Sequence, residues 1–445
     1  MFRSRFIAGV AGLSILSGCS TGANFGLGSE PIAKTGAVVV GDEPYAVKAG
    51  VAILAQGGNA ADAATAIYFA LSVTYPFAAG LGGGGICLVH DAANQRNEEF
   101  DFLARDAGGN GSYAIPGNVR GFAAMHTAYG ALSWQKVISP AEGYAAAGFP
   151  ISHALATRLG AAQDVVRLDA GLAAEFMDES GHTKAEGGTV SSRELSETLA
   201  AIRVKGADEA YSGAVGAKIV AYSQAQNGSI TQAALAGYQA DRNPPRTLSF
   251  GDQYLLLPGP QTGAGIFSGD LFEQLARAQT KNTEAAVADA TKQALNGFHV
   301  TDLPTDLGAT GFAATDQNGL AVACAVTMNG PFGSGHTAQG TGVTLARAPS
   351  SGPAGLSVAF LTPVIATDKD GQLLMAGAGA GGPVGTASMA DALVRLGKGE
   401  IVTRRGSTKG ITLYDTVNAI VCQGGNCTAL PDAGASGLGA AVPSP

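Results

Sequence analysis

Cysteine is the residue type with the most distinctive chemistry in this sequence, and the first of its five cysteines follows an export signal. Arg3 and Arg5 precede an apolar run that ends in Leu16-Ser17-Gly18-Cys19, the order typical of a bacterial lipoprotein signal. We expect cleavage before Cys19, a lipid on its thiol, and attachment to the periplasmic side of the cell envelope, with Ser20 favouring the outer membrane. The alternative is an ordinary signal peptide with a chance cysteine.

The other four cysteines fall into two pairs. Cys422 and Cys427 flank the turn signal Gln-Gly-Gly-Asn, and a hairpin disulfide can form there in an exported protein. Cys87 and Cys324 lie in apolar runs typical of strands, where two buried thiols are favoured over a bridge. No histidine lies near the C-x4-C spacing, so we expect no zinc site, and no motif implies a metal or another cofactor.

Two glycine motifs lack the context that their chemistry needs. Gly80–Gly85 fits G-x-G-x-x-G, but a dinucleotide site needs a strand before and a helix after the glycines, and here the order is reversed. Gly18–Gly22 fits G-x-S-x-G, but it lies inside the export signal. We therefore expect neither a nucleotide site nor a serine nucleophile elbow.

The composition is that of a folded chain with little charge. Among 445 residues, 65 are glycine, 14% are charged, and the formal net charge is −8. The low charge argues against a disordered chain, and the acidic balance argues against a nucleic-acid partner. No internal apolar run is long enough for a membrane-spanning helix.

Hydrophobic periodicity and turn residues predict the elements that must position any site. Residues 20–35 resemble a tether, 118–240 are mostly helical, and the tail 431–445 is expected to be disordered. Helices are predicted from Pro44 to Gly57 and from Asn59 to Tyr75. The predicted strands are Val38–Val40, Ile86–His90, Tyr254–Leu257, Gly311–Thr315, Leu320–Met328 and Ser357–Thr367, with hairpin turns at Asp316–Gly319 and Asp368–Gly371.

An ordered series of motifs resembles the gamma-glutamyltranspeptidase family. These motifs include Gly57-Gly-Asn-Ala-Ala-Asp-Ala-Ala64, Leu81-Gly-Gly-Gly-Gly85, Ile115-Pro-Gly-Asn-Val-Arg-Gly-Phe122 and Pro258-Gly-Pro260. The resemblance covers about 36–275 and 305–385, and it implies an α+β fold, the four-layer αββα sandwich of N-terminal-nucleophile hydrolases. It also divides the chain into a signal peptide (1–18), a tether (19–35), regions like the family's large (36–308) and small (309–430) subunits, and the tail (431–445).

The family's chemistry depends on an amino-terminal threonine. A precursor cleaves itself before this residue, whose hydroxyl then attacks gamma-glutamyl amides such as glutathione. The freed α-amine serves as the base, because its ordinary pKa lies near neutrality. Two backbone N–H groups of a Gly-Gly turn stabilise the oxyanion.

The expected nucleophile position holds an alanine. In the family the threonine stands ten residues before the turn glycine, which is Gly319 here, and this offset gives Ala309. A methyl group can neither drive self-cleavage nor attack an amide. A one-residue bulge could move Thr310 into the nucleophile position, or Thr310 is simply a strand residue.

Other site positions are partly kept. Thr327-Met328-Asn329 matches the family's Thr-x-Asn, which holds the nucleophile and the substrate. Gly381 and Gly382 stand where the oxyanion glycines belong, and a tight strand-to-helix turn is an equal alternative.

The residues that would bind substrate differ from the family pattern. The family's Asp-Phe-Arg reads Asp101-Phe102-Leu103 here, and Arg105, two residues further on, either replaces the lost arginine or stays exposed. The family's acidic pair aligns with Ser350-Ser351, where no carboxylate stands nearby in the sequence.

The favoured reading is a lipid-anchored member of the family with a degraded site, which binds a small peptide or amide without catalysis. The alternative is a divergent amide hydrolase or transferase that uses Thr310 as its amino-terminal nucleophile after self-cleavage.

Overall fold

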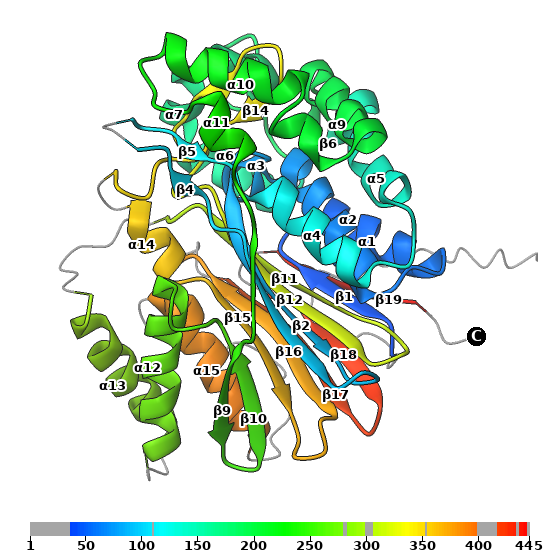
Figure 1. The fold of residues 1–445 in the computed structure, drawn as a ribbon, viewed down its shortest axis with the longest axis vertical. Coiled ribbons are helices and arrows are strands. Elements are labelled where there is room, and N and C mark those ends of the chain that lie inside the picture. The colour runs from blue at the N-terminus through cyan, green and yellow to red at the C-terminus, as the bar shows by residue number, and fades with distance from the viewer. Residues whose placement is uncertain are drawn as a thin grey trace, which may run out of the picture.

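Two stacked antiparallel sheets form the centre of the molecule, with helices on both outer faces (Figure 1). The computed structural model describes residues 36–108, 111–278, 283–298, 306–351, 354–397, 416–432 and 436–442. The expected α+β sandwich of four αββα layers is thereby confirmed. Cys19, with its signal and tether, lies outside the described residues.

The seven-stranded sheet mixes strands from the two halves of the chain. In order across the sheet they are β19 (Leu438–Ala441), β1 (Val38–Gly41), β11 (Ala309–Thr315), β12 (Leu320–Thr327), β2 (Gly84–Asp91), β3 (Arg96–Asp101) and β8 (Asp241–Asn243). Strands from the regions 36–308 and 309–430 therefore lie side by side in one sheet.

The prediction that the tail 431–445 is disordered is wrong for four of its residues. Residues Leu438–Ala441 are not disordered, because they form β19 and pair antiparallel with β1, with Val38 opposite Ala441. Without this strand β1 would present an unpaired sheet edge.

The six-stranded sheet packs against the first. Its order is β18 (Asn426–Leu430), β17 (Thr416–Gln423), β16 (Leu373–Ala380), β15 (Thr362–Thr367), β10 (Gln253–Leu257) and β9 (Arg246–Phe250). The predicted strand from Ser357 is wrong over its first residues, which belong to helix α14 (Ala354–Ala359). Leu356 and Ala359, spaced as on one helix face, pack on the core beneath α12.

The helices form the outer layers and the upper part of Figure 1. On the side of the seven-stranded sheet they are α1 (Pro44–Ala55), α2 (Ala60–Thr74), α3 (Pro76–Ala79), α4 (Asn118–Tyr129), α5 (Trp134–Ala147), α6 (His153–Ala161), α7 (Gln163–Leu168), α8 (Ala170–Phe176), α9 (Arg193–Lys205), the 3-10 helix Ala207–Ala210, α10 (Ala214–Ala225) and α11 (Gln232–Ala236). The six-stranded sheet is covered by α12 (Gly263–Arg277), α13 (Thr283–Asn296), α14 and α15 (Pro383–Gly397). Short strand pairs complete the fold: β4 (Arg105–Asp106) with β5 (Ala114–Ile115), β6 (Phe149–Pro150) with β7 (Thr189–Val190), and β13 (Thr337–Ala338) with β14 (Val343–Thr344).

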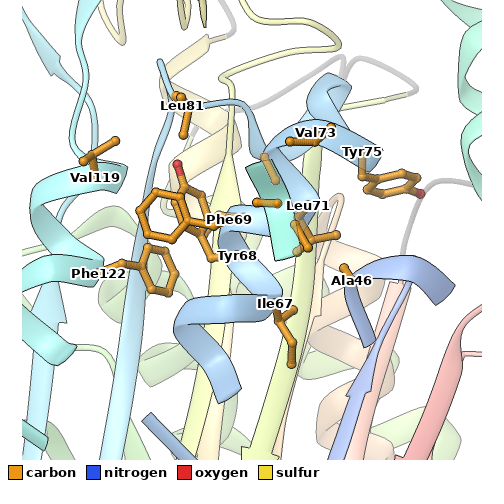
Figure 2. Packing of buried hydrophobic residues seen from close by; sticks show 14 of the residues in the cluster. Ala46, Ile67, Tyr68, Phe69, Leu71, Val73, Tyr75, Leu81, Val119 and Phe122 are labelled. Carbon is orange, nitrogen blue, oxygen red and sulfur yellow. The ribbon is translucent and has the colours of Figure 1, made fainter. Parts of the chain in front are cut away.

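Helix α2 is buried along its whole length and supports the central strands. Asn59 and Asp62 form a reciprocal capping box at its start, as the sequence Asn-x-x-Asp allows. One side of α2 packs on α4, where the rings of Tyr68 and Phe122 stack with centroids 4.1 Å apart (Figure 2). Its inner face contacts β11 and β12, so this helix fixes the sheet where the candidate site begins.

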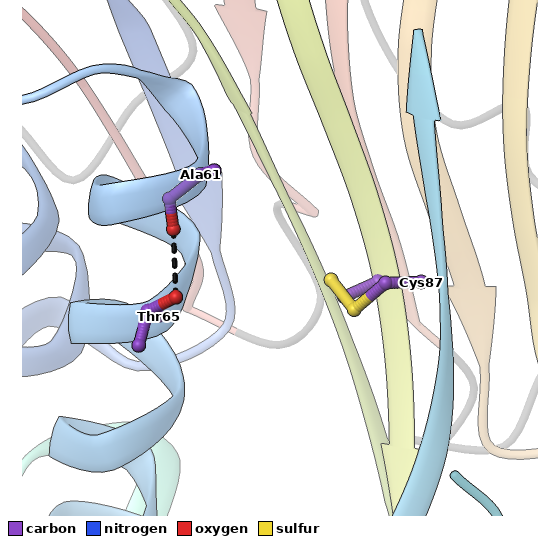
Figure 3. Close-up of a disulfide and its surroundings, with 4 residues drawn as sticks. Ala61, Thr65 and Cys87 are labelled. Atoms are coloured by element: carbon purple, nitrogen blue, oxygen red, sulfur yellow. Dashed lines mark hydrogen bonds between the residues drawn. A yellow bond between two sulfur atoms is a disulfide. The ribbon is translucent and has the colours of Figure 1, made fainter. Parts of the chain in front are cut away.

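Both cysteine pairs form disulfides between neighbouring antiparallel strands. Cys422 and Cys427 face each other in β17 and β18, as the hairpin signal allows. The preference for two free thiols at Cys87 and Cys324 is wrong, because strand register places them directly opposite each other with Cα atoms 4.1 Å apart. Figure 3 shows this disulfide between β2 and β12, with α2 nearby. Among the described residues, no helix is long and apolar enough to cross a membrane.

Candidate functional site

The candidate site begins at Ala309, the first residue of β11. Ala309 pairs with Thr327 of β12, which in turn pairs with Gly84 at the start of β2. The Ala309 side chain is buried and belongs to an apolar cluster between the sheets, together with Ile86, Ala264, Ala325, Leu361, Ala378 and Ala380. Ala309 therefore lies two strands from Gly84 in the same sheet, and a methyl group stands where the resemblance places the nucleophile.

The peptide bond before Ala309 is held by several groups. Gly308 has a φ of +59°, and a side chain there would collide with the carbonyl of Gly330. The Gly308 carbonyl accepts hydrogen bonds from the Thr327 hydroxyl at 2.9 Å and from the Met328 N–H at 3.0 Å. Two donors thus converge on the carbonyl of the bond that an active relative would cut.

The segment just before this bond is anchored in the body of the protein. Asp306 accepts a hydrogen bond from the Gly308 N–H and forms an ion pair with the buried Arg158 at 2.9 Å. Leu307 is buried in the core of the six-stranded sheet and its helices. The chain therefore enters β11 through a fixed path.

Thr310 lies apart from the Thr327 hydroxyl, because successive side chains of a strand point to opposite faces. Its hydroxyl is fully buried and donates a 2.6 Å hydrogen bond to the carboxylate of Asp42. The same carboxylate accepts hydrogen bonds from Thr416 at 3.0 Å and Asn418 at 2.7 Å. Burial raises the pKa of Asp42, against the effect of these donors. The structure thus brings Thr310 to an acid that links both sheets.

Thr327 and Asn329 stand together beside Gly308. The Thr327 hydroxyl accepts a 2.9 Å hydrogen bond from the Asn329 N–H. Asn329 has a φ of +60° and donates from its side-chain amide to the carbonyl of Arg347 at 2.8 Å. Its Oδ1 atom is buried and has no hydrogen-bond partner in the part of the chain that the structure describes.

The two oxyanion candidates follow β16. Gly381 has a φ of +95°, which favours glycine, and the Gly382 carbonyl accepts from Gly385 as α15 begins. Ala380, just before them, shares the buried cluster of Ala309. The glycines therefore form a strand-to-helix turn at the same end of the sandwich as Ala309, a geometry compatible with both alternatives that the sequence left open.

The substrate-side residues follow one of the two alternatives that the sequence left open, in which Arg105 stays exposed. Leu103 packs against the Ala309 cluster at the place of the family's arginine. Arg105 is exposed, forms an ion pair with Asp241 and lies over the ring of Tyr238 at 5.1 Å. Its guanidinium is therefore engaged at the surface.

Asp106 is a residue that sequence reasoning missed. No carboxylate stands near Ser350 in the sequence, but the fold places one there: the Asp106 carboxylate accepts from the Ser350 hydroxyl at 2.7 Å and from its N–H at 3.1 Å. The two residues lie 244 positions apart, so no local pattern could reveal their contact.

Glu99 and Asp101 form a second acidic group that the sequence analysis did not single out. They alternate along β3, and Glu99 is fully buried, with a 2.7 Å hydrogen bond from the Gly259 N–H. Burial raises the pKa of Glu99 to about 7 and also raises that of Asp101. The Glu-x-Asp spacing on a half-buried strand is the signal that could have identified them.

Comparison with known proteins connects this geometry to a family. The family model described as gamma-glutamyltranspeptidase matches residues 46–295. The glutathione hydrolase proenzyme of Pseudomonas aeruginosa is 34% identical over 248 residues, covering 51% of this chain and 43% of the relative. That of Escherichia coli is 30% identical over 325 residues, covering 65% and 56%. The chain thus spans about half the length of the curated relatives it matches.

Solved structures agree with the observed fold. A cephalosporin acylase from Bacillus halodurans superposes with a TM-score of 0.78 at 17% identity, over 93% of this chain and 97% of the acylase. The gamma-glutamyltranspeptidase of Helicobacter pylori gives a TM-score of 0.53 at 28% identity, over 57% and 80%. From its matched sequence and its αββα fold, this chain belongs to the gamma-glutamyltranspeptidase family.

Proposed function

We propose that this protein is a lipid-anchored, periplasmic member of the family that binds a small peptide or amide ligand without turning it over. The observation that carries this proposal is Ala309, which stands at the first position of the central strand opposite Thr327. The family's acyl transfer needs a hydroxyl at this position, and an alanine methyl cannot form the covalent intermediate.

The surroundings of Ala309 support the same reading. Leu103 takes the place of the arginine that would bind a carboxylate of the substrate, and the apolar cluster extends to it. The anchored segment Asp306–Gly308 favours an uncut chain, because cleavage would leave a new terminus beside the buried Leu307. The lipid anchor rests on the sequence Leu16-Ser-Gly-Cys19 alone.

The competing proposal uses Thr310 as the nucleophile after self-cleavage. One contact supports this competing proposal. The Thr310 hydroxyl lies 2.6 Å from the Asp42 carboxylate, a group that could accept its proton. Both groups are buried, however, and a substrate would have to reach them through the core.

Intact mass and an activity assay separate the two proposals. We expect the purified wild-type protein to give one mass under reducing conditions and to leave a gamma-glutamyl anilide unhydrolysed. Reduction is essential, because the Cys87–Cys324 disulfide would hold two fragments together. Two fragments split before residue 310, with activity that is lost in Thr310→Ala, would overturn the non-catalytic proposal.

A further inference from the structure

Arg347 differs from the other arginines of the described chain. Each of the others forms an ion pair with a carboxylate. The Arg347 side chain is half-buried, and its guanidinium makes no ion pair or hydrogen bond with any described residue. Partial burial of an unpaired cation costs free energy that a negatively charged partner would offset.

The Arg347 guanidinium lies at the candidate site. Its central carbon is 3.7 Å from the point where a Cβ on Gly330 would lie, so it rests over this glycine. A Cβ on Gly308 would lie 2.1 Å from the carbonyl of the same Gly330. Gly330 therefore lies between the Arg347 guanidinium and Gly308, the residue before Ala309.

Asn329 supplies a second unsatisfied group at this place. Its amide donates to the Arg347 carbonyl, and the Arg347 N–H donates to the carbonyl of Met328, so the two segments fix each other. The Asn329 Oδ1 atom has no donor from the described chain although it is buried. Asn329 also keeps a left-handed backbone, a conformation that costs free energy and clusters at functional sites.

We propose that Arg347 binds a carboxylate of the ligand, while Asn329 Oδ1 accepts a hydrogen bond from an N–H of the same molecule. The planar guanidinium matches a carboxylate through two parallel hydrogen bonds. This inference rests on the proposed function, because it assigns the ligand class of the same site. A carboxylate next to an N–H is found in a free amino acid and in the last residue of a peptide.

The geometry also explains how the site retains a cation without the family's arginine. Leu103, two residues after β3, is uncharged where the family has its arginine, and Arg347 introduces a positive charge from the loop that follows β14. The Asp106 carboxylate accepts hydrogen bonds from Ser350 and forms no ion pair with Arg347 in the part of the chain that the structure describes.

Calorimetric titration of the intact, purified protein tests the proposal. The probes are N-acetyl-alanine, its neutral amide N-acetyl-alaninamide, alanine and glycyl-alanine. We expect N-acetyl-alanine to bind at least about tenfold more tightly than its amide, the effect of losing hydrogen bonds to a charged group. Glycyl-alanine against alanine distinguishes a peptide end from a free amino acid.

Two variants test whether Arg347 is the residue that binds the carboxylate of the probe. Arg347→Gln should weaken binding of N-acetyl-alanine at least tenfold and leave binding of the amide unchanged. Arg193→Gln is the matched control, because it makes the same charge change at an exposed arginine paired with Glu197 and should leave both affinities unchanged. If Arg347→Gln does not fold, the comparison of the two wild-type affinities decides.

Three results would overturn the inference: equal affinities for N-acetyl-alanine and its amide, unchanged binding in a folded Arg347→Gln protein, or no binding of any carboxylate probe. A probe that is bound through Arg347 and also hydrolysed would instead contradict the non-catalytic function. The two proposals therefore fail in different measurements.

Discussion

Cys87 and Cys324 lie directly opposite each other in β2 and β12, and their disulfide joins the two regions that flank Ala309. The bond spans 237 residues of sequence, whereas the Cys422–Cys427 bond spans five. A cut at the start of β11 would therefore leave one covalent molecule, so cleavage must be tested under reducing conditions.

The long disulfide should contribute more to stability than the short one. A disulfide restricts the unfolded chain, and more so when it closes a longer loop. The free energy of unfolding should therefore fall by about 5 kcal/mol when Cys87 and Cys324 are both replaced by alanine, and by about 2 kcal/mol when Cys422 and Cys427 are. Urea unfolding of the two double variants measures the difference. Equal losses of unfolding free energy in the two double variants would contradict the expected dependence on loop length.

Replacing Ala309 by threonine should restore self-cleavage. The Gly308 carbonyl already accepts two hydrogen bonds, from Thr327 and Met328, and only the attacking hydroxyl is missing. We expect two fragments on a reducing gel and one band without reductant. Ala309→Val is the control, because valine matches threonine in shape and has no hydroxyl. A folded Ala309→Thr protein that stays intact would show that more than the nucleophile has been lost.

Thr310 should act on stability through Asp42. Thr310→Val keeps the side-chain shape but removes one of the hydrogen bonds to this buried carboxylate, at an expected cost of about 1–3 kcal/mol in the free energy of unfolding. Thr310→Ser keeps the hydroxyl and should lose less. An unchanged unfolding curve for Thr310→Val would contradict the structural role.

Stability should fall as the pH rises from about 4.5 to about 7. Burial raises the pKa of both Glu43 and Glu99 from 4.5 to about 7, so in this range the folded protein keeps protons that the unfolded chain releases. The contribution of these two groups to the free energy of unfolding is therefore full below about pH 4.5 and lost above about pH 7, with at most about 3 kcal/mol from each group. Burial raises the pKa of Glu175 to about 8, so this third group extends the loss to slightly higher pH.

Urea unfolding at about pH 5 and about pH 8 measures this dependence. Glu43→Gln and Glu99→Gln should each reduce it, whereas Glu197→Gln, at an exposed position, should not. A protein that gains stability between the two pH values would contradict the expectation.

Membrane attachment should depend on Cys19. The lipid is expected on this thiol, so Cys19→Ala should move the protein from the membrane fraction to the soluble fraction of fractionated cells. A Cys19→Ala protein that still sediments with membranes would contradict the lipoprotein signal.

Local patterns in the sequence were sufficient for helix α2 and for the register of the central strand. Helix α2 follows from its Asn-x-x-Asp start and its apolar run, since both act within a few residues. The offset from Gly319 placed Ala309 at the beginning of β11, where the structure has it, because a hairpin turn fixes the alignment of its own strands.

Contacts between distant segments were decided only by the tertiary structure. The Cys87–Cys324 bond, the hydrogen bond of Thr310 to Asp42, the carboxylate of Asp106 beside Ser350 and the strand β19 each join residues more than a hundred positions apart. The unpaired state of Arg347 depends in the same way on which carboxylates the fold brings near it. Side-chain partners of this kind are set by how strands from both halves align in shared sheets, and that alignment is not encoded in any short stretch of sequence.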